Sequence, residues 1–124
     1  MKVLIADDDR DLAACLAEFI RLAGHEPVAT VTNGGLAVLH EYDRTKPDVV
    51  LMDVMMPKVN GLTASHALAS RPVSPKIVFL SGKVDREHPL IMNAHADAFL
   101  SKPVTIDQLR EVMDELESAI ALKA

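Results

Sequence analysis

Acidic, hydroxyl and basic side chains follow four short apolar runs of this sequence. Three aspartates, Asp7 to Asp9, follow the first run, and Asp53 follows a later one. Ser81 and Lys102 come at the ends of two more. Mg²⁺ prefers carboxylate oxygens and completes its shell with water and phosphate oxygens. The set therefore predicts phosphoryl transfer, in which a carboxylate attacks phosphorus while Mg²⁺, Lys102 and Ser81 stabilise the phosphoryl oxygens.

Each of these residues also has a simpler structural interpretation. Asp9 has the position of a helix cap, Asp53 could begin a turn, and Lys102 could be a solvated strand end. Three carboxylates brought together would repel one another unless a cation lay among them. The combination therefore favours a Mg²⁺ site, and the sequence has no glycine-rich phosphate loop that would indicate a nucleotide site.

Alternating apolar runs and amphipathic segments predict the elements that carry these residues. Three of the five expected strands are nearly continuous apolar runs, which is typical of a parallel sheet covered by helices on both faces. In such a sheet, ligands bind outside the carboxyl ends of the strands. The expected strands are Lys2–Ala6, Pro27–Val31, Asp48–Met52, Lys76–Leu80 and Ala98–Ser101.

The first and last of five expected helices are the most clearly marked. The first carries an apolar stripe from Leu12 to Ala23, with Cys15 expected as a small core residue, and it ends at Gly24. The last begins at Thr105 and Gln108, which have the spacing of a capping box. Its expected buried face consists of Ile106, Leu109, Met113, Leu116 and Ile120.

Three shorter helices are expected at residues 35–42, 61–69 and 88–94. The second strand ends in Thr30-Val31-Thr32, which offers little chemistry and suits an edge of the sheet. Alternating strands and helices with short connections predict an α/β domain with right-handed crossovers. A chain of 124 residues has room for one such domain, over residues 1–124.

Composition excludes several classes of protein. With 49% hydrophobic and 25% charged residues, the chain is typical of folded soluble proteins. Its net charge of −5 argues against nucleic acid as a direct partner. No apolar run approaches the roughly 20 residues of a membrane helix, and the first run is too short for a signal peptide. We therefore expect a cytoplasmic protein with no membrane partner.

The polar strand ends lie in motifs that resemble those of the receiver domain of two-component response regulators. The likeness covers essentially the whole chain, and the order and spacing of the motifs are highly specific together. The resemblance implies a flavodoxin-like, doubly wound parallel sheet of five strands in the order 2-1-3-4-5. The motifs are Val3-Leu4-Ile5-Ala6-Asp7-Asp8-Asp9, Asp53-Val54-Met55-Met56-Pro57-Lys58-Val59-Asn60-Gly61, Phe79-Leu80-Ser81-Gly82 and Phe99-Leu100-Ser101-Lys102-Pro103.

The resemblance implies a role for each residue of the site. Asp53 would be the phosphoacceptor, and Lys102 would pair with the phosphoryl group. Asp7 and Asp8 would bind the metal with Asp53 and the backbone carbonyl of Met55. The cofactor implied is Mg²⁺, for which Mn²⁺ can substitute.

The resemblance also implies a switch and its partners. Phosphorylation would give Ser81 and Lys102 new hydrogen bonds, draw the loop after the fourth strand inward and let the aromatic Phe99 move. The surface of the fourth helix, fifth strand and fifth helix would then be read by an effector or form a phosphorylation-dependent homodimer. The donor would be a sensor histidine kinase or a histidine phosphotransfer protein, and a cis bond before Pro103 is usual in the family.

Two other functions use the same residues. One is a receiver that binds partners without being phosphorylated, against which the presence of Asp53, Asp8 and Lys102 argues. The other is a small Mg²⁺-dependent phosphohydrolase with an aspartyl nucleophile. Such an enzyme usually has a second acid two residues after the nucleophile, where this chain has Met55, and a cap for which 124 residues leave no room.

Overall fold

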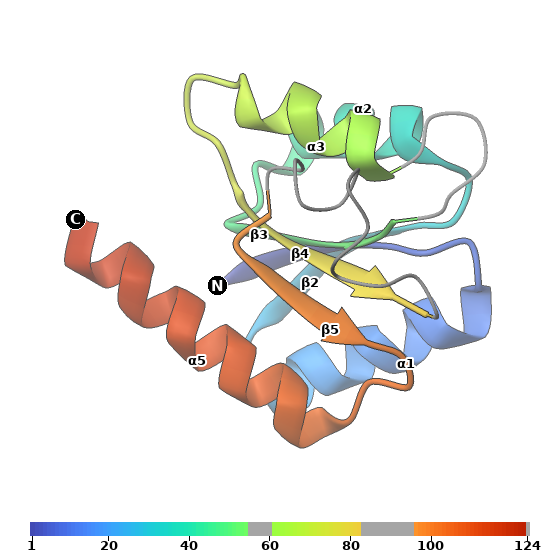
Figure 1. Ribbon diagram of the computed structural model, residues 1–124, viewed down its shortest axis with the longest axis vertical. Coiled ribbons are helices and arrows are strands. Elements are labelled where there is room, and N and C mark those ends of the chain that lie inside the picture. Colours follow the sequence, from blue (N-terminus) through green and yellow to red (C-terminus); the bar gives the residue numbers. More distant parts are fainter. Residues whose placement is uncertain (55–60, 83–95, 124) are drawn as a thin grey trace.

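The computed structural model describes residues 1–54, 61–82 and 96–123. Its strands are β1 (Lys2–Ala6), β2 (Glu26–Val31), β3 (Val49–Asp53), β4 (Lys76–Ser81) and β5 (Ala98–Ser101). Its helices are α1 (Arg10–Leu22), α2 (Gly35–Thr45), α3 (Gly61–Ala69) and α5 (Ile106–Lys123). Helices α1 and α5 cover one face of the sheet, and α2 and α3 cover the other (Figure 1). The helix predicted at residues 88–94 lies outside the described residues.

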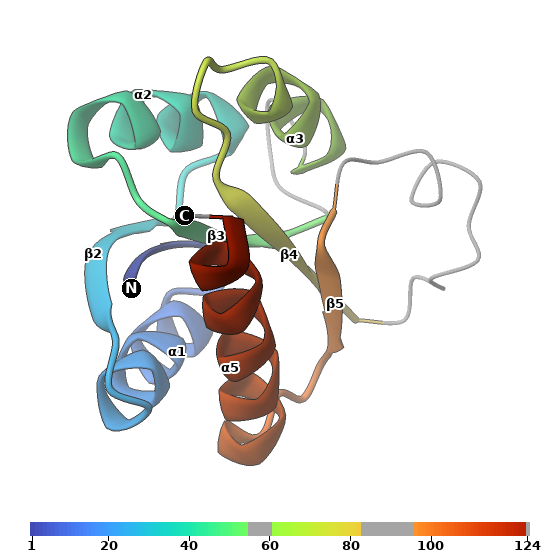
Figure 2. The same cartoon turned by 90° about the vertical axis from the view of Figure 1, so that its left-hand side faces the viewer.

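All five strands are parallel, in the order β2-β1-β3-β4-β5. This confirms the predicted flavodoxin-like α/β fold and the prediction that β2 lies at an edge. Figure 2 shows the twisted sheet between its two layers of helices. The three central strands, β1, β3 and β4, are the ones whose apolar runs predicted burial on both faces, and they are almost wholly buried. Because β1 lies beside β3, the acids that follow these strands come together.

The two faces of the sheet belong to two separate apolar cores. In β1, Val3 and Ile5 pack toward α1 and α5, whereas Leu4 and Ala6 pack toward α2 and α3. The residues of β3 and β4 alternate in the same way. Each fully buried aliphatic side chain of this kind stabilises the fold by about 1.5–3 kcal/mol. The carboxyl ends of these strands are therefore a firmly packed base for polar side chains.

Helix α1 begins and ends where the sequence predicts. The Oδ1 atom of Asp9 accepts a hydrogen bond from the N–H of Leu12 at 3.1 Å, which caps the first turn. At the other end Gly24 has a φ of 88°, in the left-handed region that favours glycine. The N–H of His25 then donates to the carbonyl of Ile20 at 3.0 Å, as in a Schellman motif.

The prediction that Cys15 is a core residue is wrong. Cys15 is exposed, because at about 100° per residue it lies on nearly the opposite side of the helix from the face that Ala13, Leu16, Ala17 and Ile20 form. Leu12 and Phe19, at the edges of the predicted stripe, are only partly buried. The buried residues of α1 are Ala13, Leu16, Ala17 and Ile20.

Helix α5 begins at the predicted capping box. The backbone N–H of Thr105 donates to the side chain of Gln108, and the N–H of Gln108 donates to the hydroxyl of Thr105, both at 3.2 Å. The predicted face packs on the sheet through its middle, whereas Ile106 and Ile120, near the two ends, are only partly buried. Its fully buried residues are Leu109, Met113 and Leu116.

Five element boundaries differ from those predicted. Strand β2 begins one residue earlier than predicted, at Glu26, and β3 begins one residue later, at Val49. Strands β3 and β4 each continue by one residue, to Asp53 and Ser81, because these polar residues still pair with the neighbouring strand. Helix α2 continues past Tyr42 to Thr45 and ends at Lys46, which has a φ of 49°. The extensions of β3 and β4 each place a site residue inside the sheet rather than in the loop that follows it.

Two aspartates join neighbouring strands at the amino end of the sheet. The Oδ2 atom of Asp48 accepts from the N–H of Lys2, and the Oδ2 atom of Asp97 accepts from the N–H of Ile77, each at 2.8 Å. The N–H of each aspartate donates back to the carbonyl of the same partner. Within the described ranges, no helix has the length and apolar character needed to cross a membrane.

Candidate functional site

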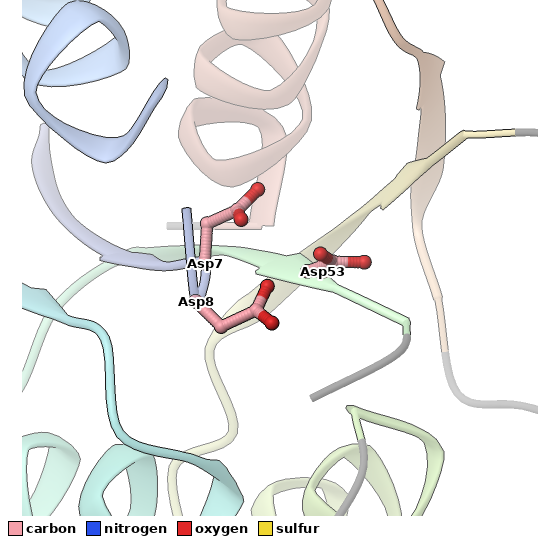
Figure 3. Close-up of side chains that lie close together, drawn as sticks. All are labelled: Asp7, Asp8 and Asp53. Atoms are coloured by element: carbon pink, nitrogen blue, oxygen red, sulfur yellow. The ribbon is translucent and has the colours of Figure 1, made fainter. Parts of the chain in front are cut away.

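Three carboxylates converge at the carboxyl end of the sheet. Asp7 and Asp8 directly follow β1, and Asp53 is the last residue of β3. One carboxylate oxygen from each lies within 4.8 Å of the others, and Figure 3 shows the three side chains facing a common space. Asp7 is completely buried and Asp53 nearly so, whereas Asp8 is exposed. The cluster is therefore anchored on the sheet side and open to solvent on the Asp8 side.

Lys102 brings a positive charge to this cluster from the far strand of the sheet. Its Nζ donates to Asp53 Oδ2 at 2.9 Å and lies 2.8 Å from Asp7 Oδ2. The residue follows β5 directly, and its N–H donates to the carbonyl of Ser81 at 2.7 Å, which holds the lysine backbone against β4. The Lys102–Pro103 peptide bond is cis.

The surroundings of Lys102 keep its ammonium group charged. Burial disfavours the charged form, but the interactions of the ammonium group with the carboxylates of Asp7 and Asp53 together outweigh it, so the pKa of Lys102 lies above its ordinary value. Lys102 is therefore protonated throughout the physiological pH range. One ammonium group among three carboxylates still leaves the site formally negative.

The donor set of the site fits a hard divalent cation. The Oδ1 atom of Asp7 accepts a hydrogen bond from the N–H of Asp9 at 2.9 Å, which fixes the carboxylate. Its Oδ2 atom is buried and faces the Lys102 ammonium group at 2.8 Å. Lys102 supplies one positive charge to three carboxylates, and the negative charge that remains favours a further cation in the cluster. Three carboxylates, with one open to water, are oxygen ligands of the kind that Mg²⁺ binds.

The residues predicted to form the switch lie on β4 and β5. Ser81 is buried at the end of β4 and pairs with Ser101 in the sheet. Phe99 is partly buried on the α2 and α3 face, with its ring 5.9 Å from that of Phe79, centroid to centroid. Met55, predicted to bind the metal through its carbonyl, lies outside the described residues.

Gly61 is a residue of the site to which the sequence analysis assigned no role. Gly61, the first residue of α3, lies against the backbone of Asp53, and a Cβ atom built on it would be 2.3 Å from the Asp53 carbonyl oxygen. The glycine was visible in the motif that begins at Asp53. Only the folded chain, however, brings the two backbones into contact.

The fold and the site together define a class of protein: flavodoxin-like domains with a carboxylate cluster and a lysine at the carboxyl edge of a parallel sheet. The model of the response regulator receiver domain family matches residues 3–114. The chain belongs to this family, whose members are regulatory phosphoacceptor modules of two-component systems.

The relatives of the chain include proteins of about its own length and proteins about twice as long. The chemotaxis protein CheY of Thermotoga maritima is 31% identical over 116 residues, which cover 93% of this chain and 96% of that protein. The sensory transduction protein RegX3 of Mycobacterium tuberculosis (strain ATCC 25618 / H37Rv) is 34% identical over 107 residues, which cover 86% of this chain but only 46% of RegX3. The chain thus spans about half the length of the first curated relatives it matches.

Solved structures of receiver domains are similar over nearly the whole chain. The REC domain of AraT, a response regulator from Geobacillus stearothermophilus, superposes with a TM-score of 0.87 at 26% identity, covering 98% of this chain and 96% of that domain. The Francisella response regulator 1452 receiver domain superposes with a TM-score of 0.83 at 25% identity, covering 96% and 98%.

Proposed function

We propose that residues 1–124 act as a single receiver domain that accepts a phosphoryl group on Asp53 from a phosphohistidine. The observation that carries this proposal is the Asp53 carboxylate, which lies at the carboxyl end of a buried strand within 2.9 Å of the Lys102 ammonium group. A carboxylate next to two further carboxylates and an ammonium group has the parts that phosphoryl transfer to an acid needs.

The proposed metal site uses Asp7, Asp8, Asp53 and the backbone carbonyl of Met55, and it would hold Mg²⁺ or Mn²⁺. When bound, the cation supplies positive charge against the phosphoryl oxygens. Asp7 is fixed by its hydrogen bond from the N–H of Asp9 and supplies a buried oxygen ligand. Asp8 is exposed and would be the carboxylate that a hydrated cation meets first.

The transfer itself places a new bond on Asp53. An oxygen of its carboxylate bonds to phosphorus as the phosphorus–nitrogen bond of the phosphohistidine breaks, and the electron pair of that bond returns to the imidazole nitrogen. Lys102 is protonated and already faces this carboxylate, so it neutralises charge on the phosphoryl oxygens without being recruited from solvent. Ser81 would donate its hydroxyl hydrogen to one of those oxygens.

The proposed output is a shift between two conformations. New hydrogen bonds from Ser81 and Lys102 to the phosphoryl group would favour one position of the loop after β4, and Phe99 would move with it. We place the partner-binding surface on β5, α5 and the segment between β4 and β5. The domain would act in the cytoplasm. Its partners would be a sensor histidine kinase or a histidine phosphotransfer protein, a downstream effector and, as one form of output, a second copy of the chain.

Intact mass spectrometry tests the proposal directly. The protein is incubated with acetyl phosphate and Mg²⁺, and the wild type is compared with Asp53→Asn and with Asp97→Asn. Asp97 is a matched control because it lies at the opposite end of the sheet, where an asparagine oxygen can still accept from Ile77. We expect one Mg²⁺-dependent phosphoryl adduct on the wild type and on Asp97→Asn, and none on Asp53→Asn.

Other outcomes favour the two alternative functions. No adduct on a folded wild type would favour a receiver that binds its partners without phosphorylation. Continuous release of phosphate from added phosphomonoesters, lost in Asp53→Asn, would favour a phosphohydrolase. An adduct that persists in Asp53→Asn would place the phosphoacceptor on another residue.

A further inference from the structure

We propose that Gly61 is a positioning residue that sets the place of the Asp53 carboxylate by letting α3 lie directly on the end of β3. The inference rests on the proposed function, since it assigns Gly61 a role in phosphoryl acceptance. It begins from a close approach between two backbones: a Cβ atom on Gly61 would lie 2.3 Å from the Asp53 carbonyl oxygen, 3.1 Å from Val54 Cα and 3.2 Å from the Asp53 carbonyl carbon.

All three of these neighbours are backbone atoms, so they cannot rotate away from an added side chain. The end of β3 is also held on its other side. Asp53 pairs with Leu80 in the sheet, and the N–H of Val54 donates to the carbonyl of Leu80 at 3.1 Å. The N–H of Gly61 donates to the carbonyl of Val54 at 3.0 Å. The backbone that carries the phosphoacceptor therefore lies between β4 and the first turn of α3.

A side chain at position 61 must displace either this backbone or α3. The positions of the Asp53 oxygens follow from its backbone, and two features of the site depend on them. These are the 2.9 Å hydrogen bond from Lys102 and the grouping of oxygens from Asp7, Asp8 and Asp53 within 4.8 Å. A shift of an ångström would break the first and distort the second. Cation affinity and the rate of phosphoryl acceptance thus both depend on the absence of a side chain at position 61.

The requirement at Gly61 is one of space and not of backbone angle. This distinguishes it from Gly24, whose φ of 88° disfavours other residues but around which a Cβ atom would meet nothing within 4 Å among the described residues. Gly82, next to Ser81, would also meet nothing within 4 Å in that part of the chain. Gly24→Ala is therefore a control for lost stability, and Gly82→Ala is a control for a methyl group added at the same end of the sheet.

The experiment measures Mg²⁺ affinity by calorimetry and the rate of adduct formation with acetyl phosphate. We expect Gly61→Ala to lower both by about tenfold or more, as changes in residues that orient metal ligands do. We expect Gly82→Ala and Gly24→Ala to match the wild type in both, although Gly24→Ala unfolds more easily. Wild-type values in Gly61→Ala would overturn the proposal, as would an equal loss in Gly24→Ala, which would trace the effect to stability alone.

Amide hydrogen exchange of the cation-free wild type gives a second test, which needs neither a folded variant nor a phosphorylated protein. If the contact is held, the N–H groups of Gly61 and Val54 exchange as slowly as those of β3. Fast exchange at Gly61, as in a fraying helix end, would overturn the proposal even if Gly61→Ala did not fold. If the wild type takes no phosphoryl group, the proposed function fails, while the exchange and the Mg²⁺ titration still decide the role of Gly61.

Discussion

Aspartates lie at both ends of the sheet, but their partners differ. At the amino end, Asp48 and Asp97 accept hydrogen bonds from backbone N–H groups of neighbouring strands. At the carboxyl end, Asp7 and Asp53 share the ammonium group of Lys102, with Asp8 beside them. The same residue type thus closes the sheet at one end and forms a charged cluster at the other.

This difference determines what each carboxylate can do. A backbone N–H is fixed by the sheet, so a carboxylate bonded to it holds two strands together and has no reason to exchange its partner. A lysine side chain is a flexible point charge that can move from a carboxylate to another anion. The proposed binding of a cation and a phosphoryl group at the carboxyl end would therefore leave the hydrogen bonds between the strands intact.

The largest expected effect comes from replacing the lysine at each end. Lys102→Met removes the charge that faces Asp53, and we expect adduct formation with acetyl phosphate to slow by about 100-fold or more. Lys76→Met is the matched variant, because Lys76 Nζ lies 3.7 Å from Asp97 Oδ1 at the amino end. The rate of adduct formation, measured by intact mass, should be the same for Lys76→Met as for the wild type. A similar loss in both variants would contradict the comparison.

For the free energy of unfolding we expect the reverse: a change at the amino end of the sheet should lower it more than a change at the carboxyl end. Asp97→Ala leaves the buried N–H of Ile77 without its acceptor, which should lower the free energy of unfolding by about 1–3 kcal/mol. Asp8→Ala removes an exposed carboxylate from a repulsive cluster and should, in the absence of divalent cation, leave that free energy unchanged or raise it. Urea unfolding in a chelator measures both. A larger loss in Asp8→Ala would reverse the roles assigned to the two ends.

The smallest effect is a dependence of stability on alkaline pH. The pKa of Lys102 is raised in the folded protein, so its interactions stabilise the fold fully below the ordinary lysine pKa of about 10.4 and are lost as pH rises through the folded-state pKa. The stability advantage of the wild type over Lys102→Met should therefore shrink above about pH 10. Urea unfolding across this range should show the two curves converging, and parallel curves would show that Lys102 does not carry the effect.

Much of this arrangement could be predicted from local sequence. Apolar runs revealed the buried strands, the capping box marked the start of α5, and Gly24 marked the end of α1. The parallel sheet followed from the alternation of elements, and a parallel sheet brings its carboxyl ends together. It was therefore predictable that Asp7, Asp53 and Lys102 would lie at one edge.

Contacts between distant segments were not predictable in this way. The acceptor roles of Asp48 and Asp97 join residues 46 and 20 positions apart, and no local pattern marks them. One ammonium group contacts both Asp7 and Asp53 because of side-chain distances in the folded protein, which cannot be derived from the positions of these residues along the sequence. Cys15 was assigned to the wrong side of α1 because the predicted apolar stripe was rotated toward Leu12 and Phe19, whereas the buried face includes the small residues Ala13 and Ala17.

The most direct test of the difference between the two ends is the stabilisation that Mg²⁺ gives to each variant. The free energy of unfolding is measured with and without Mg²⁺ for the wild type, Asp8→Asn and Asp97→Asn. A cation that binds only the folded protein raises this energy by about 2.7 kcal/mol at one hundred times its dissociation constant. We expect the wild type and Asp97→Asn to gain equally from Mg²⁺, although Asp97→Asn starts no more stable than the wild type. Mg²⁺ should raise the free energy of unfolding of Asp8→Asn only slightly. An increase in Asp8→Asn as large as in the wild type would contradict the account, and so would the absence of an increase in Asp97→Asn.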